Sequence, residues 1–267
     1  MDEDASPDVL SSLTTSETIT GGEGEDTLDG SGETLPRSYD GGAGDDFNLA
    51  AKVADAAEGG DGSDTIRPAA GDDLSYGGAG DDVIADGFGR DIIYGGEGAD
   101  SLSGGADGDF LQGGVGADTL IGSGGSDYLA GGSDNDVIDG RADQGDGPKD
   151  DGVDSLFGGT GNDQLFLDNA DQAEGGEGAD LFTIDEVAAG DGAVIITDFD
   201  PATDEIAIEY TGGADAEIPT LGINELDDGS GSQISFNDQP IATVAGVENF
   251  DASNVTLIDK AEEDSVS

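Results

Sequence analysis

The residues of this chain with the clearest chemical potential are aspartates that recur at a fixed spacing. The hexapeptide G-G-x-G-x-D begins at residues 21, 41, 59, 77, 95, 113, 158 and 175, and the starts from 41 to 113 lie 18 residues apart. Looser copies begin midway, at 86, 104 and 122, so the repeating unit is nine residues long. Because hard cations prefer several oxygen ligands, a carboxylate at the same place in every unit predicts a row of cation sites.

The nine-residue frame also defines the elements that position these aspartates. Counted from Gly41, residues 41–166 divide into fourteen units, and the sixth position is aspartate in all of them except the unit with Gly145. The eighth position is mostly large and apolar, as in Ile66 and Leu102. Glycine permits a positive φ in a tight turn, and a single inward apolar residue suits a strand of about three residues. Each unit is therefore predicted to be a turn followed by a short strand.

Two units make a coil of 18 residues, so alternate aspartates should lie on the same edge. The predicted first column contains Asp46, Asp64, Asp82, Asp100, Asp118, Asp136 and Asp154. The predicted second column contains Asp55, Asp73, Asp91, Asp109 and Asp127 and, after a gap at Gly145, Asp163 and Asp180. All of these except Asp55 are predicted metal ligands. The first-column turns that begin at 41, 59, 77, 95 and 113 keep the full glycine set, whereas the second-column turns at 50 and 68 do not, so we expect the first edge to bind more ions, and more tightly.

Composition excludes several classes of function. The chain of 267 residues has 63 acidic and 7 basic residues, a formal net charge of −56, which excludes nucleic acid as a natural partner. It contains no cysteine and no histidine, so thiolate metal sites, zinc hydrolysis of the HExxH type and Ser-His or Cys-His nucleophiles are excluded. Composition alone would also fit an acidic disordered protein, and the regular repeat is the argument against that alternative.

The repeat resembles a known family. The pattern GGxGxDxUx, with U large and apolar, is similar to the calcium-binding nonapeptide of RTX (repeat-in-toxin, hemolysin-type) bacterial secreted proteins, over roughly 160 residues. Ile195–Ile208 resembles the strand-turn-strand that follows the repeats in such proteins. The resemblance implies an all-β fold, a right-handed parallel β-roll with calcium ions in its turns. Chemistry agrees, since calcium takes six to eight oxygens, and glycine-rich turns supply carbonyls beside the carboxylates.

The acidic turns predict that folding depends on calcium. They repel one another until cations neutralise them, and strands of three residues bury little apolar area. We therefore expect calcium binding and folding to be one event, at the roughly 10⁻⁴–10⁻³ M calcium typical of extracellular modules. The resemblance implies a secreted, extracellular protein exported by a type I secretion apparatus that reads the C-terminal end. Lys260–Ser267 is a candidate part of that signal.

Four segments are expected along the chain: a flexible N-terminal segment over 1–20, the β-roll over 21–183, an antiparallel β cap over 184–259 and an acidic tail over 260–267. No cleaved signal segment and no transmembrane stretch are recognised. Residues 140–152 lose the repeat pattern and predict a loop bulging from the stack. One residue is missing between Leu167 and Glu174. Within the cap, strands are predicted at Val194–Phe199, Glu205–Tyr210, Ile234–Phe236 and Ile241–Val244, with a hairpin turn at Asn237–Asp238.

The leading functional prediction is a non-catalytic structural, adhesion or matrix scaffold with cell-surface or matrix contacts. An accessory or cryptic lyase or hydrolase that carries RTX repeats is the alternative, and nothing in the sequence places two carboxylates across a cleft. Ice binding is a third reading, but only Thr160 and Asn162 fit the required threonine and asparagine pattern. For Asp26 a ligand and a plain turn residue remain open, and Asp198, Asp200 and Asp204 are interpreted as an acidic surface loop rather than an ion site.

Overall fold

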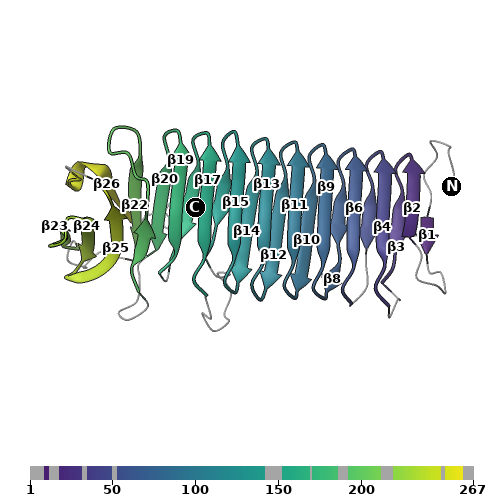
Figure 1. Cartoon of the computed structure of the whole chain (residues 1–267), viewed down its shortest axis with the longest axis horizontal. Helices are drawn as coiled ribbons and strands as arrows, with labels where there is room; N and C mark the ends of the chain where they lie inside the picture. Colours follow the sequence, from purple (N-terminus) through teal and green to yellow (C-terminus); the bar gives the residue numbers. More distant parts are fainter. Residues whose placement is uncertain are drawn as a thin grey trace.

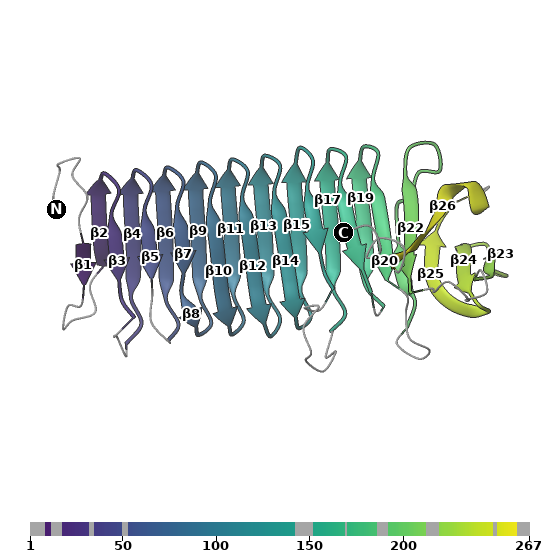
Figure 2. The same ribbon diagram turned by 180° about the vertical axis from the view of Figure 1, so that it is seen from behind.

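The chain folds into an elongated roll of stacked coils with a small cap at its C-terminal end (Figure 1; Figure 2). The structure, a computed structural model, describes residues 9–11, 18–31, 35–49, 53–141, 152–168, 170–185, 192–211, 219–247 and 250–260. Strands alternate between two long sheets as the chain winds from coil to coil, and in these ranges each sheet has 13 strands. The fold is all-β, a parallel β-roll with a C-terminal cap, as the sequence predicts.

The first sheet is built from β1 (Val9–Ser11), β3 (Thr27–Asp29), β5 (Phe47–Leu49), β7 (Thr65–Arg67), β8 (Ala69–Ala70), β10 (Val83–Phe88), β12 (Ser101–Ala106), β14 (Thr119–Gly124), β16 (Val137–Asp139), β18 (Gln164–Leu167), β20 (Leu181–Asp185), β22 (Glu205–Tyr210) and β26 (Val255–Asp259). The second sheet is built from β2 (Thr18–Glu23), β4 (Ser38–Ala43), β6 (Ala56–Asp61), β9 (Leu74–Ala79), β11 (Ile92–Glu97), β13 (Phe110–Val115), β15 (Tyr128–Ser133), β17 (Ser155–Thr160), β19 (Gln172–Glu177), β21 (Val194–Ile196), β25 (Gln239–Ala245), β24 (Gly231–Phe236) and β23 (Leu221–Glu225).

The 18-residue period appears directly as strand register. Ile84 of β10 pairs with Leu102 of β12, and Leu102 pairs with Leu120 of β14, always in parallel. These eighth-position side chains are almost fully buried and form one continuous core along the roll. Because side chains alternate across a strand, the seventh and ninth positions face outward on both sheets. The interior is therefore filled largely by single apolar residues contributed by each strand.

Two irregularities alter the period after Asp46. Asp127 and Asp154 lie 27 residues apart, and so do Asp136 and Asp163. In each pair the amide of the first aspartate still donates to the carboxylate of the second. The chain between β16 and β17 is therefore nine residues longer than the 18-residue period, and the loop predicted at 140–152 lies largely outside the described ranges, which omit residues 142–151. The predicted one-residue deletion is confirmed, because Asp163 and Asp180 occupy equivalent places only 17 residues apart.

The cap is more continuous with the roll than an antiparallel unit would be. Strand β22 pairs in parallel with β20 and β26, and β21 pairs in parallel with β19 and β25, so both sheets extend into the cap. Only β23, β24 and β25 pair antiparallel. The turn between β24 and β25 has positive φ at Asn237 (51°) and Asp238 (63°), which is the hairpin expected there. A short 3-10 turn, η1 (Ala252–Asn254), precedes β26.

Part of the expected N-terminal segment forms strands. Val9–Ser11 and Thr18–Thr20 belong to strands β1 and β2, which pair with β3 and β4. Residues 1–8 and 12–17 of that segment, and residues 261–267 of the expected tail, lie outside the described ranges. Within those ranges no helix is long and apolar enough to span a membrane.

Candidate calcium-binding edges

Each edge of the roll carries a ladder of buried aspartates that are joined through the backbone. The amide of Asp64 donates to Oδ1 of Asp82 at 2.8 Å, and the amide of Asp82 donates to Oδ1 of Asp100 at 2.9 Å. The second edge repeats the arrangement, with the amide of Asp73 2.8 Å from Oδ1 of Asp91. One oxygen of each such carboxylate thus stabilises the preceding coil.

The second oxygen of most ladder aspartates is buried and has no hydrogen-bond partner. These Oδ2 atoms belong to Asp46, Asp64, Asp82, Asp100, Asp118, Asp136, Asp163 and Asp180 on one edge, and to Asp73, Asp91, Asp109 and Asp127 on the other. Native proteins rarely leave a buried carboxylate oxygen unsatisfied, because the lost hydration is costly. A cation beside these oxygens would remove that cost. Twelve of the thirteen predicted ligands share this feature, and Asp154 is the exception.

The glycines bring backbone oxygens to the same places. Oδ2 of Asp100 and the carbonyl oxygen of Gly113, in the next coil, both crowd the position where a β-carbon on Gly95 would stand. Gly59 and Gly77 have the same neighbours from their own turns. A carboxylate oxygen and a carbonyl oxygen from adjacent coils therefore converge beside a residue that must lack a side chain. This is the donor set that calcium prefers.

The fit to calcium rests on these mixed oxygens rather than on clustered side chains. Among the described residues, no group of three or more acidic side chains is arranged to hold a metal ion. Each ion would therefore combine one or two ladder carboxylates with carbonyl oxygens of the turns, and bound calcium would supply the positive charge that the columns lack.

Burial and repulsion between like charges raise the pKa of the ladder carboxyls. Burial is the main cause for Asp82, whose pKa rises to about 7, with Asp100 and Asp64 adding repulsion. Burial likewise raises the pKa of Asp109 to about 8 and that of Asp136 to about 7. Without a metal ion, these carboxyls favour a proton at a pH where exposed aspartates are ionised. The columns thus need either protons or a cation.

The nine additional residues between β16 and β17 exchange the two columns beyond Asp136. The sequence-based assignment of Asp154, Asp163 and Asp180 to their columns is therefore wrong. Asp163 and Asp180 continue the first column, because the amide of Asp136 donates to Asp163 at 2.9 Å and that of Asp163 donates to Asp180 at 2.9 Å. Asp154 belongs to the second column, where it accepts from the amide of Asp127 at 2.8 Å. A nine-residue excursion shifts every later turn to the opposite edge, and counting in nines cannot reveal it.

Three further residues extend the ladders. The amide of Asp26 donates to Oδ1 of Asp46 at 2.7 Å, so Asp26 opens the first column despite its 20-residue offset. Asp171 continues the second column, since it accepts from the amide of Asp154 at 2.9 Å. Asp204 closes the first column by accepting from the amide of Asp180 at 3.1 Å. The recurrence of ADAAEGG at 54–60 as ADQAEGG at 170–176 aligns Asp171 with Asp55 and could have identified it; no periodic signal points to Asp204.

The second edge is less regular than the first. Arg37 stands at the place of a ladder aspartate, and its amide donates to Oδ1 of Asp55 at 2.8 Å. Pro68 and Asp86 occupy positions that are glycine in most first-column turns. Asp86 is fully buried, with both carboxylate oxygens 3.0 Å from the hydroxyl of Ser75. Burial raises the pKa of Asp86 to about 8.

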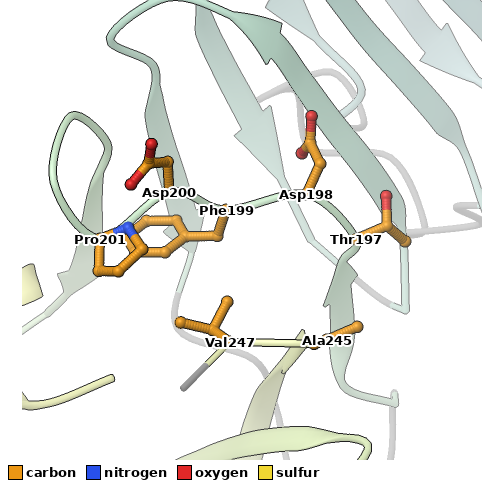
Figure 3. A pocket seen from close by; sticks show the side chains of 8 residues that line it. Thr197, Asp198, Phe199, Asp200, Pro201, Ala245 and Val247 are labelled. Carbon is orange, nitrogen blue, oxygen red and sulfur yellow. The ribbon is translucent and has the colours of Figure 1, made fainter. Parts of the chain in front are cut away.

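A small cavity of about 340 Å³ lies where the roll meets the cap, between residues 197–201 and 245–247 (Figure 3). The carboxylate of Asp198 accepts from the amides of Gly175 at 2.9 Å and Gly176 at 2.7 Å, so it covers the last first-column turn. Asp200 accepts from the amide of Ala202 at 2.9 Å. In Figure 3 both carboxylates point away from Ala245 and Val247 on the opposite wall. These groups organise the junction rather than face each other across the cavity.

Comparison with known proteins agrees with this geometry. The family model of the RTX calcium-binding nonapeptide repeat matches residues 13–33, 54–75, 76–111, 112–145 and 150–182, together more than half of the chain. The chain therefore belongs to the RTX calcium-binding nonapeptide repeat family, which binds calcium ions at multiple sites. No curated protein sequence matches it.

Two solved structures are similar to the chain. One is the AlgE6R3 subunit of the mannuronan C5-epimerase from Azotobacter vinelandii, 24% identical, with a TM-score of 0.28 over 57% of this chain and 78% of that one. The other is the extracellular lipase LipA from Serratia marcescens, 19% identical, with a TM-score of 0.24 over 84% of this chain and 40% of that one.

Proposed function

We propose that this protein is secreted, folds when it meets extracellular calcium and then acts as a structural, adhesion or matrix scaffold. The observation that carries the proposal is the set of buried, unpartnered carboxylate oxygens along both edges. In the absence of a cation these oxygens oppose folding. A chain that stays unfolded at low cytosolic calcium is suited to a type I secretion apparatus, and the acidic end from Lys260 is proposed as part of its signal.

The thirteen predicted ligands are retained in this proposal, in their corrected columns. Eight of them on the first edge have the unpartnered oxygen, against four on the second. First-edge turns also bring a carbonyl oxygen of the next coil beside that carboxylate, as at Gly41 and Gly59. These differences support more and tighter sites on the first edge.

The roll offers extended surfaces and its carboxylates are tied to backbone amides, which supports a scaffold rather than a catalyst. Surface or matrix contacts would then be made by the outward faces of the sheets. The acidic cap residues favour no second function, since Asp198 and Asp204 serve as acceptors for turn amides.

A calcium titration followed by circular dichroism tests the proposal. We expect little strand signal in excess chelator and a cooperative gain as calcium rises through about 10⁻⁴–10⁻³ M. Magnesium serves as the control ion, because its octahedral demand and retained waters suit these turns poorly. A complete strand signal in chelator would contradict folding on calcium, and an equal response to magnesium would contradict calcium-selective turns.

A further inference from the structure

Three polar side chains lie inside the N-terminal part of the roll, at positions where most other units have a large apolar residue or glycine. Asn48 and Ser75 occupy eighth positions and are 1% and 0% exposed, and Asp86 replaces the first-position glycine and is 0% exposed. From Ile93 to Leu129 every eighth position is isoleucine or leucine and is buried. The core therefore changes near Asp86, and the coils that end there are here called the N-terminal coils.

These polar groups are poorly satisfied inside the roll. Both carboxylate oxygens of Asp86 lie 3.0 Å from the hydroxyl of Ser75, which has one hydrogen to donate. The side-chain amide of Asn48 donates to the carbonyl oxygen of Glu58 at 3.0 Å, but its Oδ1 is buried with no hydrogen-bond partner in the described part of the chain. Buried polar groups that lack partners oppose folding because their hydration is lost. The interior therefore stabilises the N-terminal coils less than the coils that follow.

The backbone of the N-terminal coils is also less regular. In the first sheet, Pro68 separates β7 from β8, whereas β10, β12 and β14 each run for six residues. Proline has no amide hydrogen to donate to a neighbouring strand. Ala69 has a positive φ of 87°, at a place where Gly87 and Gly105 of the next coils have 103° and 116°. Because a β-carbon makes this conformation unfavourable, the turn at Ala69 is strained where the later turns are not.

The N-terminal coils also have fewer candidate ion sites to offset these costs. Among the described residues, buried and unpartnered Oδ2 atoms begin at Asp26 on the first edge but only at Asp73 on the second. Before Asp73 on the second edge, Arg37 takes the ladder place that precedes Asp55, and residues 50–54 contain no glycine. Calcium would therefore stabilise the first coils along one edge and the later coils along both.

We propose that the roll responds to calcium in two steps, in which the N-terminal coils fold only at a higher calcium concentration than the coils from Ile92 onward. In a stack of repeats each coil contacts only its neighbours, so one end opens while the rest stays folded. The boundary lies at Ser75 and Asp86, because Ile93 and Gly104 take their places in the next coil. At intermediate calcium the protein is then a shorter roll with open N-terminal coils. The inference rests on the proposed folding with calcium.

Hydrogen exchange of the full chain at stepped calcium concentrations, read by mass spectrometry, tests the proposal. We expect the amides of β4, β6 and β9 to become protected at a calcium concentration about twofold or more above that for β13, β15 and β17. The double change Ser75→Ile and Asp86→Gly reproduces the residue pair of the next coil, so it should bring the two midpoints together. Coincident midpoints in the natural chain, or midpoints that this variant leaves unchanged, overturn the proposal.

Two further variants separate the units. Asn48→Leu, between Leu28 and Ile66 in register, should lower the midpoint of the N-terminal coils alone, and equal movement of both midpoints contradicts two separate units. The matched control, Ala173→Val, enlarges a buried eighth position among the later coils and should leave the N-terminal midpoint unchanged, because those coils are already folded when the N-terminal coils respond. A chain that stays unprotected in saturating calcium overturns the proposed function as well, whereas a single transition overturns this inference alone.

Discussion

The backbone amide of Asp82 lies 2.9 Å from Oδ1 of Asp100, one coil further along the chain, while Oδ2 of Asp100 is buried without a partner. One carboxylate thus has two separable roles, a hydrogen-bond acceptor for the preceding coil and a candidate ligand for a cation. The same division recurs along both edges. It makes the contribution of the ion measurable apart from that of the ladder.

Asp100→Asn separates these roles. Asparagine keeps an oxygen for the amide of Asp82 but loses the charge and replaces the second oxygen with an amide nitrogen, which cannot bind a cation. We expect the affinity of that site for calcium to fall by about tenfold, a loss of roughly 1.4 kcal/mol, and the calcium concentration at the folding midpoint to rise. The matched change on the second edge, Asp73→Asn, should have a smaller effect. Equal shifts in a calcium titration would contradict the difference between the edges.

Gly96→Ala tests the turn backbone. Gly96 has a φ of 128°, and a β-carbon there would overlap the carbonyl oxygen of Gly78 in the preceding coil. Strain of this kind costs about 1–3 kcal/mol before the overlap is counted. Gly124→Ala is the control, because its β-carbon would lie 3.9 Å from the oxygen of Gly105. Denaturant unfolding in saturating calcium should show a large loss for the first variant and little for the second; similar losses would argue against the close approach of the coils.

Protons on the ladder carboxyls should partly replace calcium in stabilising the roll. The folded pKa values of Asp73, about 7, and Asp154, about 8, lie above the ordinary value of 3.8, so the calcium-free roll binds more protons than the unfolded chain. Its stability therefore falls as pH rises from about 4 to 8. Because protonation stabilises the calcium-free roll relative to the unfolded chain, lowering the pH should lower the calcium concentration at the folding midpoint. Titrations followed by circular dichroism between about pH 5.5 and 8.5 check this, and a midpoint that rises as the pH falls would contradict it.

Arg141→Gln tests the contacts that Arg141 makes at the end of β16. The Arg141 guanidinium lies 2.8 Å from Asp139, 3.5 Å from Asp185 and 3.4 Å from Glu209, and 4.4 Å from the ring of Phe166. Its removal leaves partly buried carboxylates with Lys260, so we expect a loss of about 1–2 kcal/mol that saturating calcium does not restore.

Arg90→Gln is the control for that change. Arg90 and Asp72 are 3.7 Å apart and largely exposed, so their pairing contributes little to stability. Thermal unfolding in excess calcium should separate the two variants. An unchanged transition for Arg141→Gln would contradict a stabilising role for its contacts with Asp139, Asp185 and Glu209.

The repeating part of the fold could be predicted because each nine-residue unit contains the residues that determine its own turn and its own buried position. Glycine, aspartate and the eighth-position apolar residue act locally and recur at a fixed period, so even one missing residue near Leu167 could be detected. The exchange of columns after Asp136 could not be predicted in this way. Equivalent aspartates there are 27 residues apart rather than 18, and the number of residues alone does not say on which edge the later aspartates lie.

The contacts between the roll and the cap could not be predicted from the repeat either. Asp204 joins the first column 24 residues after Asp180, and strand β26 reaches the first sheet from the far end of the chain. These contacts depend on tertiary packing rather than on any period. The ring contacts along the second sheet were hidden for a related reason, because Tyr94 and Phe110 occupy ninth and seventh positions of their units, and only the folded coils place their rings side by side.

The ladder of amide-to-carboxylate bonds gives the roll a direction, since every coil takes its acceptor from the coil that follows, and Asp204 ends the series in the cap. A coil in the middle of the roll therefore makes the same backbone contact with any following coil that has an aspartate at the equivalent position. Duplication or loss of whole 18-residue coils should leave both ends intact. The length of such a protein can then change by gene duplication in steps of one coil, and it could be shortened or extended by design in the same steps.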